Sequence, residues 1–233
     1  MSRISFTELL SDRARQAGLF VESHVAAALD AYFELLRRWN RKINLTGLNL
    51  DALTSEGMDR LFIEPLLAAR HVAPGTARII DLGSGGGSPA IPLTLAVPSA
   101  SVTMVESRTK KSVFLLEAAR ELGLEARVLT VRYEDALGQG ELVEAFDTLT
   151  SRALRLDAHD VAQVHTLVRD GGRLILFRSA SRPDELEVAP PLALVQVEPL
   201  PRPDSQLLVL EKHIGNVPRG TVSSRLDPKR SSS

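Results

Sequence analysis

The clearest indication of the fold is the stretch IIDLGSGGGSPAIPL, residues 79–93. An apolar run ends at Asp81, four glycines follow within six positions, and a second apolar segment begins at Pro89. This order predicts a buried strand, a tight loop and a helix. Glycines in such a loop let the backbone approach a ligand closely, because they carry no Cβ. The pattern therefore predicts a ligand site at the carboxyl end of the strand, where the helix also offers free N–H groups.

Short apolar segments alternate with amphipathic ones on both sides of this loop. Helices are expected at residues 89–97, 109–123 and 157–172, with a short helix or turn at 133–137. No helix separates the last two strands, so they should form an antiparallel hairpin. The expected fold class is α/β, a Rossmann-like seven-stranded sheet with helices on both faces and a terminal hairpin. Its strands are predicted at 77–83, 101–106, 126–132, 146–151, 172–179, 193–200 and 206–213.

The N-terminal residues 1–72 are expected to form a helical extension. Apolar side chains recur at helical spacing over residues 24–39, and a second helix over 58–72 should break or kink at Pro65. The expected organisation is a helical region at 1–72, a ligand-binding sheet domain at 73–214, and a flexible basic tail at 215–233 that is rich in serine and proline.

The composition restricts the class of protein. The chain has 233 residues, 44% of them hydrophobic, a net charge of −1 and no cysteine. Disulfides, cysteine zinc sites and cysteine nucleophiles are therefore excluded. The sequence has no signal peptide, no apolar run of membrane length and no cluster with metal-ligand spacing, so we expect a cytoplasmic protein, a monomer without membrane or metal partners. A nucleic acid would have to meet local basic patches.

Two classes of adenosine cofactor compete for the glycine loop. A dinucleotide site would need G-x-G-x-x-G, but the third glycine position holds Ser88. The segment from Asp81 to Gly87 fits the D-x-G-x-G-x-G pattern of an S-adenosylmethionine site, with Gly83 and Gly85 between them. A methyltransferase site is therefore favoured over a dinucleotide oxidoreductase, and the helix-free terminal hairpin favours it too.

Acidic and aromatic residues follow the next two strands. Glu106 ends the second strand, where a carboxylate can accept hydrogen bonds from both ribose hydroxyls of an adenosine. Tyr133 and Glu134 follow the third strand, in the turn that faces adenine in adenosine-binding sheets. The tyrosine could pack on the purine, and Glu134 or Asp135 could accept a hydrogen bond from its amino group. Acids at the start of a helix are also favourable without a ligand, so both interpretations stay open.

Four segments of the chain are distinctive in combination: RRWNRKINLTG (37–47), RIIDLGSGGGSPAIPL (78–93), MVESRTKKSVFLLEAARELGL (104–124) and FDTLTSRAL (146–154). Together they resemble the bacterial small-subunit (16S) rRNA guanine-N7 methyltransferase family, also called glucose-inhibited division protein B. The resemblance extends from about residue 30 to the tail. It implies S-adenosylmethionine as cofactor, 16S rRNA or the small ribosomal subunit as partner, and Arg152 beside the transferred methyl group, with Ser88 also lining the cofactor pocket.

The chain also departs from this family's pattern, more in the face expected to meet RNA than in the cofactor half. Leu61, Glu64 and Pro65 stand where the family has H-x-x-D-S. The other departures are Ser88 for a large apolar residue, Ala90 for glycine, Arg178-Ser179 for Lys-Gly, and Arg155 for alanine. They leave open a methyltransferase of the same fold with another substrate, and a non-catalytic RNA-binding or ribosome-assembly protein.

Methylation at guanine N7 is consistent with the absence of motifs that other nucleobase methylations require. N7 carries an in-plane lone pair and no proton, so in-line placement is required and a general base is not. The absence of cysteine argues against C5 methylation of pyrimidines, and the absence of N-P-P-Y or D-P-P-Y after the fourth strand argues against methylation of amino groups. Candidate RNA contacts are Arg37, Arg38, Arg41, Lys42, Asn44 and Arg178, together with Arg108, Lys110 and Lys111 after the second strand and the basic tail.

Overall fold

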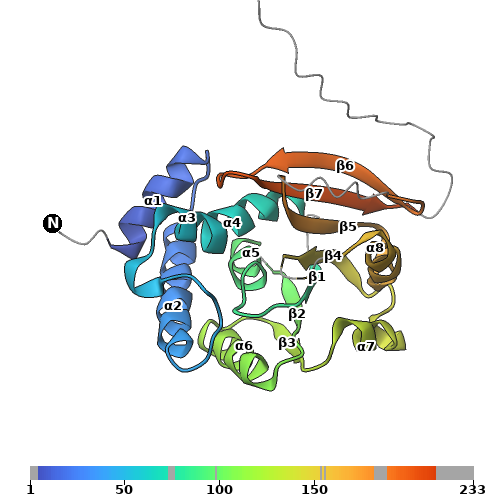
Figure 1. Cartoon of the computed structure of the whole chain (residues 1–233), viewed down its shortest axis with the longest axis horizontal. Coiled ribbons are helices and arrows are strands. Elements are labelled where there is room, and N and C mark those ends of the chain that lie inside the picture. Colours follow the sequence, from blue (N-terminus) through green and yellow to red (C-terminus); the bar gives the residue numbers. More distant parts are fainter. Residues whose placement is uncertain are drawn as a thin grey trace, which may run out of the picture.

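The computed structural model describes residues 5–72, 77–97, 99–152, 154, 156–180 and 188–213 (Figure 1). The expected flexible tail, the departure at Arg155, and the residues 73–76 beside the expected domain boundary lie outside this part of the chain.

A seven-stranded mixed sheet forms the centre of the protein, in the order β3-β2-β1-β4-β5-β7-β6. The first five strands are parallel, and β7 runs antiparallel to both β5 and β6. All seven predicted strands and the terminal hairpin are confirmed, and the fold is Rossmann-like. Strand order reverses between β1 and β4, which is where such sheets bind ligands. The strands are β1 (Arg78–Leu82), β2 (Ser101–Val105), β3 (Ala126–Leu129), β4 (Phe146–Ser151), β5 (Val168–Ser179), β6 (Leu192–Pro199) and β7 (Ser205–Lys212).

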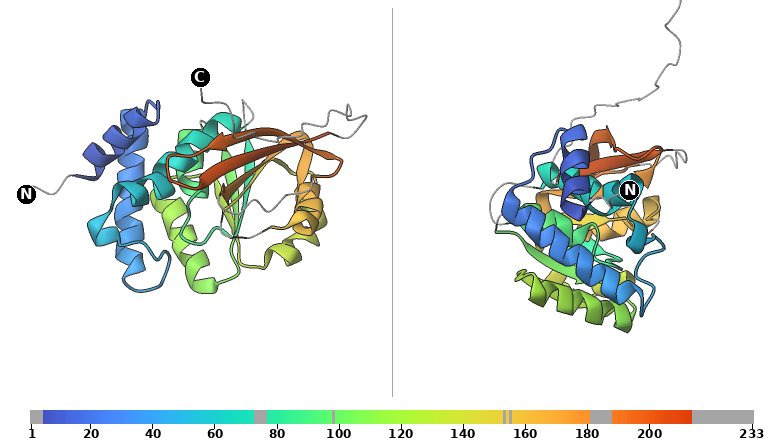
Figure 2. Two further views of the ribbon diagram at one scale, coloured as in Figure 1. Left: turned by 45° about the horizontal axis from the view of Figure 1, so that its top comes forward. Right: turned by 90° about the vertical axis from the view of Figure 1, so that its left-hand side faces the viewer.

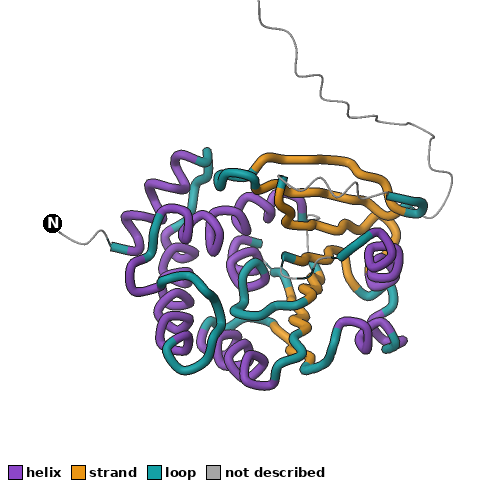
Figure 3. Tube along the Cα trace, in the orientation of Figure 1, coloured by secondary structure: helices purple, strands orange, loops and turns teal. Residues whose placement is uncertain are grey.

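Helices cover both faces of this sheet (Figures 1, 2 and 3). Both faces are apolar, because side chains alternate along each strand. In β1, Ile79 belongs to the first of two apolar clusters, and Ile80 and Leu82 belong to the second. One face carries α1 (Phe6–Gln16), α2 (Ser23–Asn40), α4 (Glu64–Ala68), α5 (Ala90–Ala96) and α6 (Thr109–Glu121), and the other carries α7 (Tyr133–Leu137) and α8 (Ala158–Val164). Within the described ranges, no helix is both long and apolar enough to cross a membrane.

The N-terminal helices share the first apolar cluster with the sheet. The helical pattern predicted over residues 24–39 is confirmed by α2, which buries Tyr32 and Phe33. Phe62 packs edge-on against both rings, with ring centroids 5.9 and 6.1 Å away. Residues of β1, β2, β5 and β7 belong to the same cluster, so the helical extension and the sheet are packed around one continuous core.

Pro65 does not break the helical segment, although the regular α-helix changes just before it. The chain remains helical from α3 (Ser55–Met58) through a π-helical turn, Asp59–Ile63, into α4. Pro65 has no N–H to donate. In a π-helix this N–H would bond to the carbonyl of Arg60, and in an α-helix to the carbonyl of Leu61, so neither carbonyl receives a hydrogen bond from residue 65. Both carbonyls accept side-chain donors instead, from Arg152 and Ser88.

The predicted helix over residues 157–172 is too long. Helix α8 ends at Val164, a single 3₁₀ turn follows, and Val168 already begins β5. The pairing register between β4 and β5 shifts near Phe146, which absorbs the additional residues of β5. A Cβ on Gly172 would lie 2.9 Å from the carbonyl oxygen of Asp147, so this glycine permits close strand contact and does not end a helix.

Candidate active site

The glycine loop leaves β1 and turns back toward β2. The N–H groups of Gly83 and Ser84 both donate to the carbonyl of Val105, at 2.9 and 3.0 Å. Gly83 and Gly85 have φ angles of +75° and +54°, a region that favours glycine. A Cβ on Gly83 would also lie 2.9 Å from Leu154 Cγ. Both positions therefore require glycine for backbone reasons.

Glu106 fixes the other side of this loop. Its side chain follows β2 and is buried. One carboxylate oxygen accepts from the N–H of Gly85 at 2.9 Å, and the other accepts from the N–H of Arg108 at 2.8 Å. Each carboxylate oxygen has a second lone pair, so this arrangement orients the carboxylate and leaves it able to accept further hydrogen bonds.

A pocket of about 380 Å³ opens beside this carboxylate, at the carboxyl ends of β2 and β3. It brings together five of the predicted cofactor residues from three separate loops: Gly83, Gly85, Glu106, Tyr133 and Glu134. Three basic residues that the sequence analysis did not assign to the cofactor site also line the pocket: Arg108, Lys111 and Arg132. A Cβ on Gly85 would lie about 4 Å from Lys111 Nζ and Glu106 Oε2, so glycine keeps this corner of the pocket clear.

Tyr133 is held in the pocket wall by a residue that sequence reasoning missed. Its hydroxyl donates to Asp160 Oδ1 at 2.9 Å. Partial burial, and then the hydrogen bond to Asp160, raise the pKa of Tyr133 to about 12, so the hydroxyl stays protonated. Asp160 also forms a reciprocal capping box with Asp157 at the start of α8. The D-x-x-D spacing of this cap was the available sequence signal.

Asp81 is the second-last residue of β1, beneath the loop, and is buried. Its Oδ1 accepts from the Thr150 hydroxyl at 2.6 Å, whereas Oδ2 has no hydrogen-bond partner among the described residues. Burial raises the pKa of this carboxyl to about 6, although the hydrogen bond from Thr150 and the nearby Ser84 hydroxyl, which donates to the Asp81 carbonyl, act in the opposite direction. A buried carboxylate with an unused oxygen is suited to a positively charged ligand group.

Gly87 and Ser88 lie on the opposite side of the loop and are not among the residues that line the pocket. A Cβ on Gly87 would lie 2.6 Å from Ile91 Cδ1, so this glycine allows the loop to pack on α5. The preceding carbonyl, of Gly86, accepts from the buried Tyr32 hydroxyl of α2 at 2.5 Å. The Ser88 hydroxyl donates to the Leu61 carbonyl at 2.9 Å.

Arg152 follows β4 and lies on this opposite side. Its Nη1 donates to the carbonyl of Arg60 and lies 3.3 Å from Ser88 Oγ. The guanidinium carbon lies 4.1 Å from the ring centre of Phe177, a cation–π contact. Burial lowers the pKa of Arg152 to about 10, and the nearby Glu64 carboxylate partly offsets this effect. Arg152 therefore remains charged at neutral pH.

Glu64 is a buried partner of Arg152 that the sequence analysis noted only as a departure. Its Oε2 lies 3.2 Å from Arg152 Nη2. Its Oε1 accepts a hydrogen bond at 2.6 Å from Nε of Arg202, which lies in the turn between β6 and β7. A glutamate inside the apolar run LFIEPLL was the available signal, because a buried carboxylate needs a charged partner.

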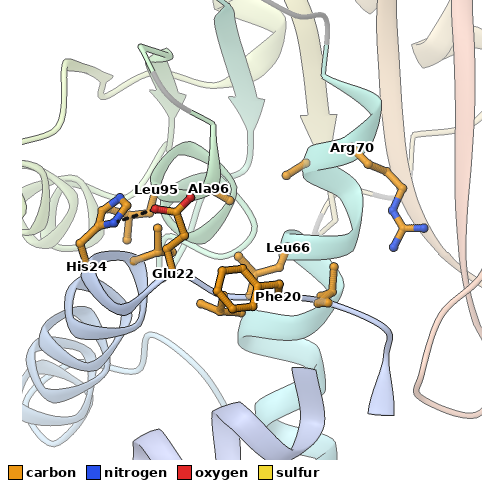
Figure 4. A pocket seen from close by; sticks show the side chains of 11 residues that line it. Phe20, Glu22, His24, Leu66, Arg70, Leu95 and Ala96 are labelled. Atoms are coloured by element: carbon orange, nitrogen blue, oxygen red, sulfur yellow. Dashed lines mark ion pairs between the residues drawn. The ribbon is translucent and has the colours of Figure 1, made fainter. Parts of the chain in front are cut away.

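A second hollow of about 370 Å³ lies away from these residues, between α2, α4 and α5. Figure 4 shows Phe20 and Leu66 near its centre, with the Glu22–His24 ion pair on one side and Arg70 on the other. It takes in none of the predicted site residues. Among the described residues, no group of acidic and histidine side chains could hold a metal ion.

The comparisons agree on one family. The family model described as rRNA small subunit methyltransferase G matches residues 25–202. The chain belongs to this family. A relative from Syntrophotalea carbinolica with the same name, Ribosomal RNA small subunit methyltransferase G, is 34% identical over 88% of this chain and 98% of its own length. Another, from Xanthomonas euvesicatoria pv. vesicatoria, is 37% identical over 86% of this chain and 90% of its own length.

Solved structures show the same fold at low sequence identity. A proposed O-methyltransferase from Klebsiella pneumoniae aligns with a TM-score of 0.60 at 12% identity, over 87% of this chain and 96% of its own. The [4+2]-cyclase SpnF aligns with a TM-score of 0.57 at 15% identity, over 84% and 98%. The fold alone therefore does not specify the reaction. Membership of a methyltransferase family, together with this fold, implies S-adenosylmethionine as the cofactor.

The predicted RNA-contact residues of this family member lie mainly at the end of α2. Arg37 pairs with Glu34 at 2.6 Å, Arg41 with Asp51 at 2.6 Å, and Arg38 with Glu121 at 3.4 Å. Arg38 and Arg41 remain mostly exposed, so their ion pairs are weak and can be exchanged for phosphates. Lys42 and Asn44 are exposed as well.

Arg178 lies apart from this group, near the end of β5. Its guanidinium donates to the carbonyl of Leu156, in the segment that follows Arg152. It therefore helps to hold that segment against the sheet, and its role in RNA binding stays a prediction.

Proposed function

We propose that this protein transfers a methyl group from S-adenosylmethionine to N7 of a guanine in 16S rRNA. The observation that supports this most strongly is the pocket lined by Gly85, Glu106 and Tyr133, next to Arg152 across the glycine loop. The printed names of the relatives concern small-subunit rRNA. The choice of guanine N7 rests on the resemblance in segments 37–47, 78–93, 104–124 and 146–154.

The residues of the pocket fit an adenosine that carries a positive charge. Glu106 would accept hydrogen bonds from the ribose hydroxyls, because its carboxylate is already oriented by two backbone N–H groups. Tyr133 would pack on the adenine, and Glu134 would accept from the adenine amino group. Asp81 would stabilise the cationic end of the cofactor through its unused Oδ2. Gly83 and Gly85 would allow the loop backbone to approach the ligand.

The cofactor supplies an electrophilic methyl group, and the protein's task is to place the acceptor. Guanine N7 needs no base, so the expected contribution is orientation and exclusion of water. Arg152 is the proposed catalytic residue. Its guanidinium is nearly buried, with a side chain 10% exposed. Among the described residues, its Nε and Nη2 have no hydrogen-bond partner, and Nη2 is held near Glu64 by the ion pair alone. A donor of this kind could bind an oxygen of the acceptor base while the lone pair on N7 stays free.

RNA would be bound through exposed cations on the N-terminal side. Arg38, Arg41 and Lys42 cluster at the end of α2, and Asn44 follows in the loop. Contacts to phosphate position an RNA without reading its sequence, so recognition of the target would depend on the reaction site. The proposed substrate is 16S rRNA, alone or within the small ribosomal subunit.

The experiment that tests this function uses the full-length protein with methyl-labelled S-adenosylmethionine. 16S rRNA and intact small subunits from a strain lacking the gene are the two substrates, and nucleosides are analysed after digestion. The expected product is N7-methylguanosine at a single position. Label on another base would indicate a different substrate specificity. Cofactor and RNA binding without transfer would select the non-catalytic, ribosome-assembly alternative. Binding of NADH in place of S-adenosylmethionine would overturn the cofactor assignment.

A further inference from the structure

The carboxylate of Glu64 is buried behind the proposed reaction centre and has no exposed surface. It contacts residues from three other parts of the chain: Arg152 after β4, Arg202 in the β6–β7 turn and Ser205 at the start of β7. A carboxylate in such a position is stable only when charged partners compensate it. Among the residues described, the ion pairs of Glu64 within 4.0 Å are those to Arg152 and Arg202.

Arg152 is held on several sides. Its Nη1 contacts the Arg60 carbonyl and Ser88 Oγ, and Phe177 packs against the face of the guanidinium. Glu64 contributes the nearest negative charge, 3.2 Å from Nη2. The other contacts restrain the guanidinium through neutral groups. Arg60 and Arg202 repel it, and Asp81 attracts it less than Glu64 does, so Glu64 exerts the largest attraction on the charged end of Arg152.

We infer that Glu64 is a positioning residue for the proposed methyl transfer: it fixes the guanidinium of Arg152 at the carboxyl end of β4, so that the acceptor base meets this group in one orientation. The inference rests on the proposed function, because Arg152 is taken to touch the acceptor. Glu64 itself touches neither cofactor nor base. A misplacement of about 1 Å at a reacting centre can cost on the order of 100-fold in rate, so the effect should appear in turnover.

The competing explanation is purely structural. Glu64 could serve only to fasten α4 to the β6–β7 turn through Arg202, in which case its removal would destabilise the fold without a specific effect on turnover. The chain provides a matched control on the same helical segment. Asp59 is buried and forms two hydrogen bonds to Arg13 of α1, at 2.6 and 2.8 Å. It is a second buried acid paired with arginine, and no contact joins it to Arg152 among the described residues.

The test is a double-mutant cycle with Glu64→Gln and Arg152→Gln, assayed by methyl transfer to small subunits and by S-adenosylmethionine binding. We expect Glu64→Gln to lower kcat at least about 10-fold when Arg152 is present, and less than about 2-fold when Arg152 is already Gln. The dissociation constant for S-adenosylmethionine should change less than about 3-fold in each variant, because the cofactor pocket lies across the loop. Asp59→Asn should lower the melting temperature and leave kcat unchanged.

Glu64→Gln removes the compensation of two buried arginines and could fail to fold. In that case the Glu64→Asp variant takes the place of Glu64→Gln in the cycle, because aspartate keeps the negative charge and shortens the side chain by one methylene. The same pattern is expected: a loss of kcat that depends on Arg152. Provided that the wild-type protein is active, two outcomes would overturn the inference. One is a loss of kcat that is equal with and without Arg152, and the other is a loss of kcat that is equal in the Glu64 and Asp59 variants. Wild-type protein that binds the cofactor but transfers no methyl group would overturn the proposed function, and the inference with it.

Discussion

The two sides of the glycine loop are built differently. On one side, the pocket around Glu106 and Tyr133 is open, and its acidic side chain is oriented by backbone N–H groups. On the other side, Arg152 and Glu64 form a closed cluster, compensated by an ion pair to Arg202. The open side leaves room and unused lone pairs for a ligand, whereas the closed side fixes a charged group before any ligand arrives.

The difference suggests a division of tasks. Substitutions on the open side should change how tightly the cofactor binds, and substitutions on the closed side should change turnover at nearly constant cofactor affinity.

Arg152→Gln should lower kcat by about 100-fold or more, because loss of a single preorganised donor at a reacting group typically has an effect of this size. Cofactor affinity should stay within about 3-fold of wild type, since Arg152 does not line the pocket. Single-turnover kinetics with labelled cofactor and calorimetry would measure the two quantities. Arg127→Gln is the control, because it removes a cation that pairs only with the exposed Glu141 in the described structure. A larger effect on cofactor affinity than on kcat would contradict the division.

Glu106→Ala should weaken S-adenosylmethionine binding by about 10-fold or more, because it removes the proposed acceptor for the ribose hydroxyls and releases the Gly85 N–H. Saturating cofactor should restore most of kcat. Titration calorimetry of Glu106→Ala beside Glu141→Ala, an exposed acid outside the pocket, would measure this. Unchanged affinity would refute the ribose role of Glu106.

The pH dependence of cofactor binding should report on Asp81. Its pKa is raised to about 6 by burial, so the carboxylate that binds a cation is lost as the pH falls below 6. The affinity should fall by up to about 10-fold per pH unit there, and Asp81→Asn should give a flat, weaker profile. Stability of the free protein should respond in the opposite direction. The folded state holds this proton more tightly than the unfolded chain does, so the contribution of Asp81 to stability rises as the pH falls from above 6 toward 4. Thermal unfolding with and without cofactor separates the two effects.

Tyr133→Phe should have the smallest effect. It keeps the ring that would pack on adenine and removes the hydrogen bond to Asp160. We expect about 2-fold weaker cofactor binding and about 1 kcal/mol lower stability, typical of one lost hydrogen bond. Calorimetry and chemical denaturation would measure these changes. Tyr133→Ala, which removes the ring, should weaken binding clearly more, and equal effects of both variants would argue against stacking.

The residues of the open side could be predicted from the sequence. On the closed side Arg152 and Ser88 could be named as candidates, but the pairing of Arg152 with Glu64 could not be predicted. Asp81, Gly83 and Gly85 lie in one continuous motif, and Glu106 and Tyr133 follow the next two strands, so the parallel sheet alone brings them to one edge. The sequence of an α/β fold already contains this spacing. Gly87 belongs to the same motif but packs on α5, which the motif could not reveal.

The closed side depends on contacts between distant segments. Glu64 and Arg202 are 138 residues apart, and their encounter follows from how the β6–β7 turn reaches α4. The sequence could show that a glutamate inside an apolar run needs a partner, but it could not say which arginine supplies it. The continuity of the helical segment through Pro65 was not predicted for a related reason, because the carbonyl acceptors that the proline leaves unpaired are satisfied by Ser88 and Arg152 from other elements.

The π-helical turn before Pro65 has a consequence for variation in this protein. The acceptors that hold Arg152 and Ser88 there are the main-chain oxygens of Arg60 and Leu61, which every amino acid carries. The exposed side chain of Arg60 can therefore change between relatives while the anchor stays in place. An alanine scan would miss this anchor at position 60. Replacing the proline, which restores a backbone N–H that competes for those oxygens, would expose it.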